Sequence, residues 1–483
     1  MAMKGDSFMS LNSQQHDILT LFNLESDNVE DISFANEGSN AIIRISLRAN
    51  YPPCPDCGNK HVLIKGYETK KINHGILTDR KCILYYKARR YRCPVCRRTF
   101  YEHNPFTFSS MKISALTVMN VLRDLKNQCE TFTSVAQRYH ISPTSVASIF
   151  DQHVQMPRLS LPELMAIDET YAFHHRGENS KYVFTMLDYN NCIPVDILPS
   201  RRLDYLRNYY LNIPVEERRN VRMIATDMYH EYRTMIHEIF PDSIHCVDHF
   251  HVIQELSRKT DSVRIRVMRS VPKYITGTHS LTSEYYLLKK FNWLIFKRND
   301  ALDSHKKPLF DPNRERIMNH KLQRMLNYYD IRELIEAIHP DLKAAWRLKD
   351  DIVDFYDDNT YSSAQMALND MISRFFHSGI PEMISFGRTL RNWDREIINS
   401  FIVVGVRHRI DKETGQVVIS DQKLNTNLME NRNSIIKTIK KNANGYANWH
   451  RFRNRCLYVL RPDSLPVLNP LAPRKVINRD KPT

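Results

Sequence analysis

Apolar residues in the middle of the chain fall into five short runs, at residues 164–167, 182–187, 193–198, 221–225 and 244–247. Each run is apolar or β-branched at mostly consecutive positions, and turn-like or helical segments separate the runs. This pattern is typical of strands that are covered on both faces. It predicts an α/β sheet within residues 158–252.

The pattern changes after this region. Residues 253–420 contain long mixed stretches of charged and apolar positions, such as the one around Trp346, with few strand signals. They predict an all-helical insertion. Residues 421–465 are then expected to return to the sheet domain with its last helix, and residues 466–483, near several prolines, predict an irregular tail.

The first 157 residues divide into three parts. Residues 1–50 are expected to form a small capping region that contains a strand at 41–47. Residues 51–105 are rich in Cys, Pro, Tyr and Arg, which is typical of a compact module held by a metal. Residues 106–157 predict a helical DNA-binding part.

Two Cys-x-x-Cys pairs provide the clearest metal signal: Cys54 with Cys57, and Cys93 with Cys96. Four thiolates at this spacing predict one structural Zn²⁺ in a zinc ribbon; the alternative is four unrelated buried cysteines. The amino terminus lacks an apolar signal core, so we expect a cytoplasmic protein, associated with the nucleoid through DNA, whose cysteines do not form disulfides. Cys82 is expected to be a packing residue.

A net charge of +15 and a pI near 9.3 indicate a polyanionic partner, and nucleic acid is the expected one. No apolar stretch approaches the roughly 20 residues needed to cross a bilayer, so no membrane partner is expected. Tyrosines interleave with the basic residues around the second cysteine pair, and the expected phosphate contacts are Arg89, Arg90, Arg97 and Arg98. The alternative is a solvated basic face.

Residues 132–150 have the pattern of a helix-turn-helix. Ser142 is the expected N-cap of the second helix and Pro143 its first residue. Thr144, Ser145 and Ser148 would then be free to contact a major groove. The alternative is an ordinary helical hairpin.

Asp168 and Asp227 each follow an apolar run and are expected at the ends of neighbouring strands. Two carboxylates at one sheet edge can hold a divalent ion together. Glu430 is a candidate third ligand on a helix, where helical spacing places Lys437 and Lys441 on its face.

The residues alone leave other acids open as the third ligand. Asp248 also follows a strand-like run, and Asp188 and Asp196 are weaker candidates. His249 and His251 lie beside Asp248, but no fourth ligand presents itself, so a zinc site is not expected there.

Taken together, the sequence resembles the ISL-three group of bacterial insertion-sequence transposases in the DDE superfamily. The resemblance covers almost the whole chain and is carried by the four cysteines, the helix-turn-helix pattern, Ile167-Asp168-Glu169, Thr226-Asp227-Met228, Asp248-His249-Phe250, residues 345–349, the segment from Glu430 to Leu457 and the spacing of Glu430 from Lys437. It implies an α/β ribonuclease-H-like catalytic core with a large all-helical insertion, preceded by a zinc ribbon and a helix-turn-helix. The implied triad is Asp168, Asp227 and Glu430, which favours Glu430 over Asp248.

The function expected from this resemblance is cleavage and rejoining of DNA. Two Mg²⁺ ions, with Mn²⁺ as an alternative, would be held by the triad. The partners would be terminal inverted repeats, target DNA and at least one more copy of the chain, since two ends must be paired. Two alternatives remain open, a non-catalytic DNA-binding regulator and a nuclease without strand transfer.

Overall fold

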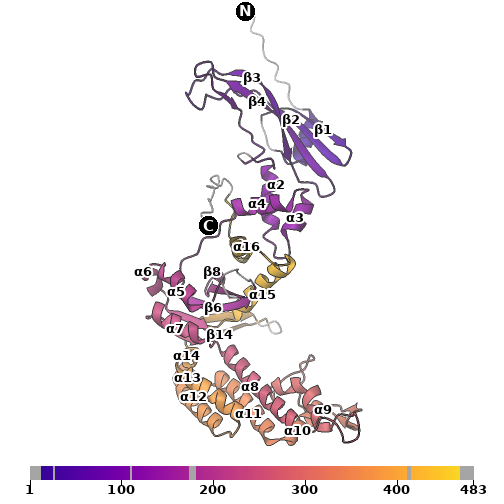
Figure 1. Ribbon diagram of the computed structural model, residues 1–483, viewed down its shortest axis with the longest axis vertical. Coiled ribbons are helices and arrows are strands. Elements are labelled where there is room, and N and C mark those ends of the chain that lie inside the picture. Colours follow the sequence, from indigo (N-terminus) through magenta and orange to yellow (C-terminus); the bar gives the residue numbers. More distant parts are fainter. Residues whose placement is uncertain (1–11, 25–27, 109–110, 173–180, 411–414, 468–483) are drawn as a thin grey trace, which may run out of the picture. The chain divides into compact units, whose positions relative to one another are not determined.

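The computed structural model describes residues 12–24, 28–108, 111–172, 181–410 and 415–467 (Figure 1). The chain forms two compact units. The first comprises Met1–Arg158, Tyr171–Lys181 and Arg432–Thr483, and the second comprises Leu159–Thr170 and Tyr182–Asn431. Each unit therefore combines segments that are distant in the sequence.

The first unit begins with a five-stranded sheet. Its elements are α1 (Ser13–Leu21), β1 (Val29–Glu37), β2 (Asn40–Leu47), β3 (Leu63–Asn73), β4 (Lys81–Arg92) and β5 (Thr99–Tyr101). The strand order is β1-β2-β4-β3, with β5 also paired to β4. β2 is the strand expected at 41–47, and it runs parallel to β4. The predicted boundary at residue 50 is therefore wrong, because the supposed capping region and the cysteine module share one sheet and bury apolar residues in one core.

Helices complete the first unit: α2 (Ala115–Asp124), α3 (Phe132–Arg138), α4 (Pro143–His153) and α16 (Trp449–Leu460). α16 packs against the earlier helices. The Tyr458 hydroxyl donates to the Leu122 carbonyl at 3.2 Å, and Arg451 pairs with Asp151 at 2.5 Å. The prediction that residues 421–465 belong wholly to the catalytic core is therefore wrong for α16, because its partners lie about 300 residues earlier in the chain.

The second unit is built on a mixed sheet of β6 (Leu164–Tyr171), β7 (Tyr182–Asp188), β8 (Ile193–Leu198), β9 (Met223–Thr226) and β10 (Ile244–Val247). The order is β10-β9-β6-β7-β8, in which β6, β9 and β10 are parallel and β7 and β8 antiparallel. The five apolar runs are thus confirmed as five strands. Helices α5 (Leu203–Leu211), α6 (Val215–Arg219) and α7 (His230–Ile239) lie between them in the chain, and α5 and α7 pack on the sheet's core.

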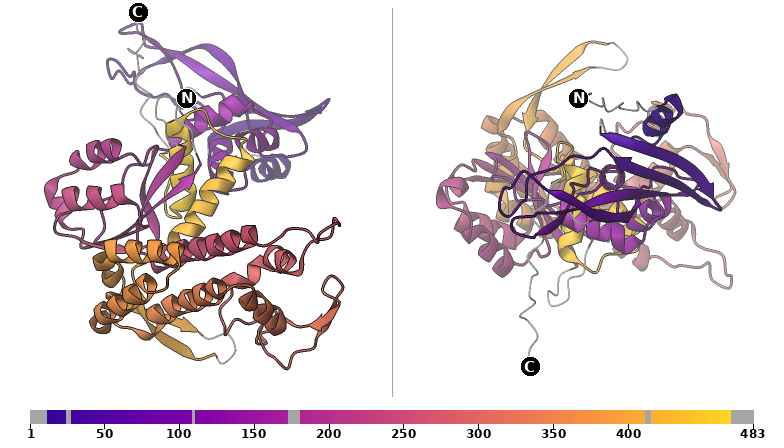
Figure 2. Two further views of the ribbon diagram at one scale, coloured as in Figure 1. Left: turned by 60° about the horizontal axis from the view of Figure 1, so that its bottom comes forward. Right: turned by 90° about the horizontal axis from the view of Figure 1, so that it is seen from above.

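A helical region follows the sheet (Figure 2). It comprises α8 (His249–Ser270), α9 (Ser283–Lys290), the short 3₁₀ helix η1 (Asn292–Phe296), α10 (Tyr328–Ile338), α11 (Pro340–Asp358), α12 (Tyr361–Phe376), α13 (Pro381–Asn392) and α14 (Asp394–Asn399). Trp346 is fully buried at its centre and donates its indole N–H to the Lys297 carbonyl at 3.1 Å.

The expectation of an all-helical insertion is wrong in two places. Two hairpins interrupt it, β11 (Ile317–Asn319) with β12 (Arg324–Leu326), and β13 (Val403–Ile410) with β14 (Val417–Lys423). The second hairpin forms in a β-branched stretch, which favours strand over helix because such side chains are stiff at χ1. The region ends in α15 (Asn427–Asn442).

No helix among the described residues is long and apolar enough to cross a membrane. Of the predicted tail at 466–483, residues 468–483 lie outside the described residues. Val467 contacts the end of α4 in the same unit, since its backbone N–H donates to the His153 carbonyl at 2.7 Å.

Candidate active site and zinc site

Asp168 lies within β6, three residues before its end, and Asp227 directly follows β9, the adjacent parallel strand. The prediction that Asp168 lies at the end of a strand is therefore wrong, because β6 continues to Tyr171. Leu164 pairs with Met223 and Ala166 with Ala225, and Asp168 and Asp227 each come two residues after the last of these pairs. Neighbouring strands are about 4.8 Å apart, and paired residues point to the same face. The two acids lie close enough for Asp168 to raise the pKa of Asp227; that they hold one ion together stays a prediction.

The environment of Asp227 disfavours a negative charge. The pKa of Asp227 is raised to about 8, mainly by burial and also by the carboxylates of Glu169 and Asp168, while the Arg201 guanidinium opposes the shift. One Asp227 carboxylate oxygen is enclosed and has no hydrogen-bond partner among the described residues. A bound cation would supply the missing partner and relieve the repulsion.

The carboxylate of Glu169, next to Asp168 on β6, already has an ion-pair partner and a hydrogen-bond donor. Its carboxylate forms an ion pair with Arg201 and accepts a hydrogen bond of 2.5 Å from the buried Tyr232 hydroxyl. The Arg201 guanidinium also lies over two rings, 4.2 Å from the centroid of Tyr182 and 4.8 Å from that of Tyr229. Sequence reasoning missed this arginine, although its position three residues after β8 was a signal that could have identified it.

Asp248, the open rival for the third acid, has a structural role. Its carboxylate is buried, accepts from the Phe250 backbone N–H at 2.9 Å as the N-cap of α8, and accepts from the backbone N–H and hydroxyl of Thr426, each at 2.6 Å. These bonds join the end of β10 to the residue just before α15. Asp248 therefore fixes where α15 begins.

Glu430 lies in the first turn of α15 and is exposed. Burial lowers the pKa of His251, and three carboxylates oppose this shift, those of Asp248, Glu169 and Glu430. All three acids thus lie close enough to one imidazole to affect it.

The opposite sides of α15 differ as its sequence predicts. Ser434, Lys437 and Lys441 are exposed like Glu430, at helical spacings of four, seven and eleven residues, while Met429 and Ile436 are buried. Lys437 and Lys441 line a hollow of about 410 Å³ together with Lys440 and Tyr171. The Lys440 ammonium lies 5.0 Å from the centre of the Tyr171 ring.

The carboxylate oxygens of the three acids are not close enough together to form a complete metal site. Among the described residues, Asp168, Asp227 and Glu430 are not one of the groups whose ligand atoms all lie within 4.8 Å of one another.

The weaker rivals, Asp188 and Asp196, serve local structure. Asp188 accepts from the backbone N–H groups of Asn190 at 3.0 Å and Asn191 at 3.1 Å, within the turn after β7. Asp196 is buried and accepts from the Tyr209 hydroxyl at 2.6 Å. Neither joins the acidic edge at Asp168 and Asp227.

The four predicted cysteine ligands come together. One ligand atom from each of Cys54, Cys57, Cys93 and Cys96 lies within 4.8 Å of the others. The Cys96 backbone N–H is the main cause that lowers the pKa of Cys93, to about 6. Four thiol ligands on two tight turns fit a structural Zn²⁺, whose four positions they would fill. Cys82 is buried in the sheet core, as expected for a packing residue.

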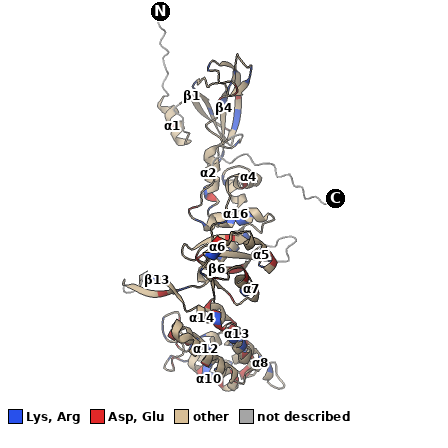
Figure 3. Cartoon of the chain, turned by 90° about the vertical axis from the view of Figure 1, so that its left-hand side faces the viewer, with Lys and Arg blue, Asp and Glu red and all other residues tan. Residues whose placement is uncertain are grey.

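Basic residues, blue in Figure 3, occur on β4. The predicted basic contacts near the second cysteine pair divide into exposed and buried arginines. Arg97 and Arg98 are exposed and Arg90 is half-buried. Arg89 is only 4% exposed and pairs with Glu30 at 2.8 Å and Glu102 at 3.3 Å. The prediction that Arg89 contacts DNA is therefore wrong, because its charge is already neutralised inside the sheet.

The tyrosines of this segment also differ from expectation. Tyr86 and Tyr91 are fully buried, so of the three interleaved tyrosines only Tyr85 is partly accessible. They stabilise the sheet rather than offer rings to a ligand.

Both helices expected between residues 132 and 150 are present as α3 and α4. The Ser142 hydroxyl accepts from the Ser145 backbone N–H at 3.0 Å, and Pro143 is the first residue of α4. Thr144 and Ser148 are exposed, and Ser145 is half-buried.

Comparison with known proteins shows the family of this chain. A family model described as transposase, of the ISL3 group of DDE transposases, matches residues 165–407, just over half of the 483-residue chain. This chain belongs to the ISL3 family of DDE transposases. A second model, the zinc-finger of the IS204/IS1001/IS1096/IS1165 transposases, matches residues 50–96. The chain is also similar to the transposase for insertion sequence element IS1001 of Bordetella parapertussis, with 21% identity over 404 residues, 83% of this chain and 86% of the relative.

Proposed function

We propose that this transposase binds the ends of its insertion sequence, cleaves DNA phosphodiester bonds and transfers the 3′ ends to target DNA. The observation that carries the proposal is the position of Asp227, which lies close enough to Asp168 for the two charges to interact and has an enclosed carboxylate oxygen without a hydrogen-bond partner among the described residues. A divalent cation is the group that this carboxylate pair accommodates.

The donor set fits Mg²⁺, which prefers oxygen ligands in proteins. Asp168, Asp227 and Glu430 would hold it, with Glu430 brought to the acidic edge by α15, whose start is tied to Asp248. Two bound Mg²⁺ ions would supply an activated nucleophile, first water and then a 3′ hydroxyl, and would offset charge on the phosphate. Mn²⁺, with similar ligand preferences, is expected to substitute.

Other residues of the chain position the site and the DNA. Arg201 and Tyr232 hold Glu169 away from the metal position, so its charge is compensated beside Asp168. Lys437 and Lys441, on the exposed face of α15, bind backbone phosphates during in-line displacement. Their hollow beside Tyr171 supports this role, because it is lined by several cationic groups and described residues supply no acid to it.

We propose that end recognition uses the amino-terminal segments. The zinc ribbon presents Arg90, Arg97 and Arg98 to phosphates, and α3 with α4 forms a helix-turn-helix that inserts α4 in a major groove. Its base contacts would come from Thr144, Ser145 and Ser148. The exposure of Thr144 and Ser148 supports this orientation.

The mixed sheet of the second unit supports a ribonuclease-H-like core. Of its three parallel strands, β6 contains Asp168, and Asp227 and Asp248 directly follow β9 and β10. The helical region separates the second acid of the triad from the third. We propose that two copies of the chain act together, because an element has two ends to be paired.

A strand-transfer assay tests the proposal. Purified protein, Mg²⁺ and a DNA fragment ending in the element's terminal inverted repeats are incubated with a target plasmid. Joined products are expected. Nicked but unjoined DNA would favour a nuclease, and binding without any cleavage would favour a regulator; either result would contradict strand transfer.

A further inference from the structure

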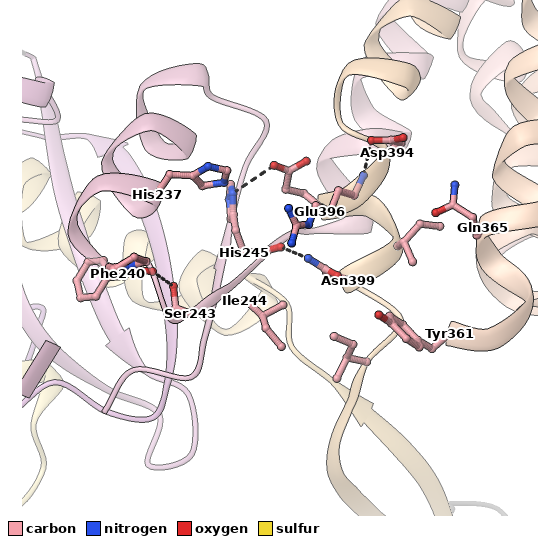
Figure 4. A pocket seen from close by; sticks show the side chains of 14 residues that line it. His237, Phe240, Ser243, Ile244, His245, Tyr361, Gln365, Asp394, Glu396 and Asn399 are labelled. Carbon is pink, nitrogen blue, oxygen red and sulfur yellow. Dashed lines mark hydrogen bonds and ion pairs between the residues drawn. The ribbon is translucent and has the colours of Figure 1, made fainter. Parts of the chain in front are cut away.

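A second group of metal-ligand residues lies in the second unit, apart from the acidic edge. It consists of His237 on α7, His245 on β10 and Glu396 on α14, and one ligand atom from each lies within 4.8 Å of the others. They line a cavity of about 530 Å³. In Figure 4 the His237 and His245 rings lie side by side and the Glu396 carboxylate points toward them.

The contacts of His245 indicate which ring nitrogen carries its proton. The Thr226 hydroxyl donates to the Asp227 carbonyl at 2.8 Å and lies 2.8 Å from His245 Nε2. A hydroxyl has one hydrogen, so in this arrangement Thr226 Oγ1 accepts from His245 Nε2–H. The lone pair of the neutral ring is then on Nδ1, which is buried and has no hydrogen-bond partner among the described residues.

This lone pair is directed toward the cluster. His245 Nδ1 lies 3.9 Å from a Glu396 carboxylate oxygen, too far for a hydrogen bond. Two acceptors that face each other without a proton between them leave a position that suits a cation. A ring nitrogen fixed by a hydrogen bond on its opposite side is the usual arrangement for a histidine metal ligand.

Glu396 keeps coordination capacity despite its ion pair. It is 5% exposed, and Arg233 contacts both carboxylate oxygens, each at 2.9 Å. An ionised carboxylate has about four lone-pair positions, so two remain. The Arg233 guanidinium is held 3.7 Å from the centre of the Trp393 ring, and its charge will weaken cation binding without blocking it.

We propose that His237, His245 and Glu396 form a second zinc site, separate from the four cysteines. Two imidazoles and one carboxylate are a ligand set that Zn²⁺ takes when its fourth position is left to water or another ligand. That position would open to the cavity. Imidazole ligands favour Zn²⁺ over Mg²⁺, so this site and the acidic edge would take different ions.

The proposed ion would stabilise the end of β9, the strand that leads to Asp227, through its ligand His245. Its ligand His245 donates to Thr226, whose hydroxyl donates to the carbonyl of Asp227. It would also join α14 of the helical region to β10 of the sheet, where the Asn399 side chain already donates to the His245 carbonyl at 2.8 Å.

Zinc stoichiometry of the full chain tests the site. Wild type, His237→Ala and His230→Ala are saturated with Zn²⁺, freed of excess ion and assayed by mass spectrometry of the metal. His237 is exposed, so its loss should leave the fold intact, and His230 is an exposed histidine at the start of the same helix that serves as the matched control. Circular dichroism checks folding.

We expect two zinc ions per chain in wild type and His230→Ala, and one in His237→Ala. Glu396→Gln should lose the same ion, which removes dependence on a single variant. Cobalt substitution adds a readout: the ion lost in His237→Ala should show ligand-field bands without thiolate charge transfer. One zinc in wild type, or equal zinc in all variants, would overturn the proposal.

Discussion

The buried carboxylate of Asp248 accepts two hydrogen bonds from Thr426, one from its backbone N–H and one from its hydroxyl, each 2.6 Å long. Asp248→Ala removes both, together with the cap of α8. We expect the free energy of unfolding to fall by about 3 kcal/mol, since bonds to charged groups and caps each contribute on the order of 1–3 kcal/mol. Urea denaturation measures it. Thr426→Val, which keeps the backbone bond, should cost about 1 kcal/mol; equal losses would contradict this account of α15.

Stability of the metal-free protein should depend on pH through Asp227. Its pKa rises from an ordinary value of about 4 to about 8 in the folded protein. The folded state therefore holds a proton that the unfolded state releases, so this contribution to stability is complete below pH 4 and is lost as pH rises toward 8. Added Mg²⁺ should stabilise the protein more at pH 8 than at pH 6, because it binds the ionised carboxylate.

Thermal unfolding at several pH values, with and without Mg²⁺, checks this. Asp227→Asn should flatten the dependence between pH 4 and 8 and remove the Mg²⁺ effect. Asp188→Asn is the control, because that carboxylate accepts bonds only within its own turn. Unchanged pH dependence in Asp227→Asn would refute the assignment.

Removing one of the four cysteine ligands is expected to destabilise the amino-terminal sheet, not to change the catalytic residues. Cys93→Ser should release one zinc ion per chain and make the amino-terminal sheet sensitive to protease, since zinc binding and folding of such a module are coupled. Metal analysis and limited proteolysis measure these effects. Cys129→Ser, at an exposed cysteine outside the cluster, should change neither. Full zinc retention by Cys93→Ser would be incompatible with a four-thiolate site.

Neighbouring arginines should respond in different ways. Arg97→Ala and Arg98→Ala should each weaken DNA binding and reduce its salt dependence by about one counterion. Arg89→Ala should instead lower stability by about 3–5 kcal/mol, because Glu102 is left buried without its partner. Binding titrations at several salt concentrations and urea denaturation separate the two. A pure binding loss in Arg89→Ala would contradict its burial.

The sheet and the acidic edge could be predicted because their signals are local. Each strand of the second unit is a continuous apolar run, and Asp168 and Asp227 directly follow such runs, so their positions needed no knowledge of distant contacts. The structural role of Asp248 could not be predicted in this way. Its carboxylate accepts two hydrogen bonds from Thr426, 178 positions along the chain, so the residues alone left Asp248 open beside Glu430.

Other features depend on partners that no sequence window contains. In the sequence, Arg89 looks like its basic neighbours, because only folding brings its partners Glu30 and Glu102 beside it. α16 has the composition of a core helix, but its buried Arg455 donates to carbonyls of residues 127 and 130. His237, His245 and Glu396 come from three elements, and only tertiary packing reveals their common cavity.

DNA cleavage by carboxamide variants tests the central claim most directly. Asp168→Asn, Asp227→Asn and Glu430→Gln are compared with wild type and the control Asp188→Asn on DNA carrying an element end, in Mg²⁺, with binding measured on the same DNA. The account predicts normal binding by all five proteins, and cleavage only by wild type and Asp188→Asn. Cleavage at the wild-type rate by any of the three triad variants would contradict it.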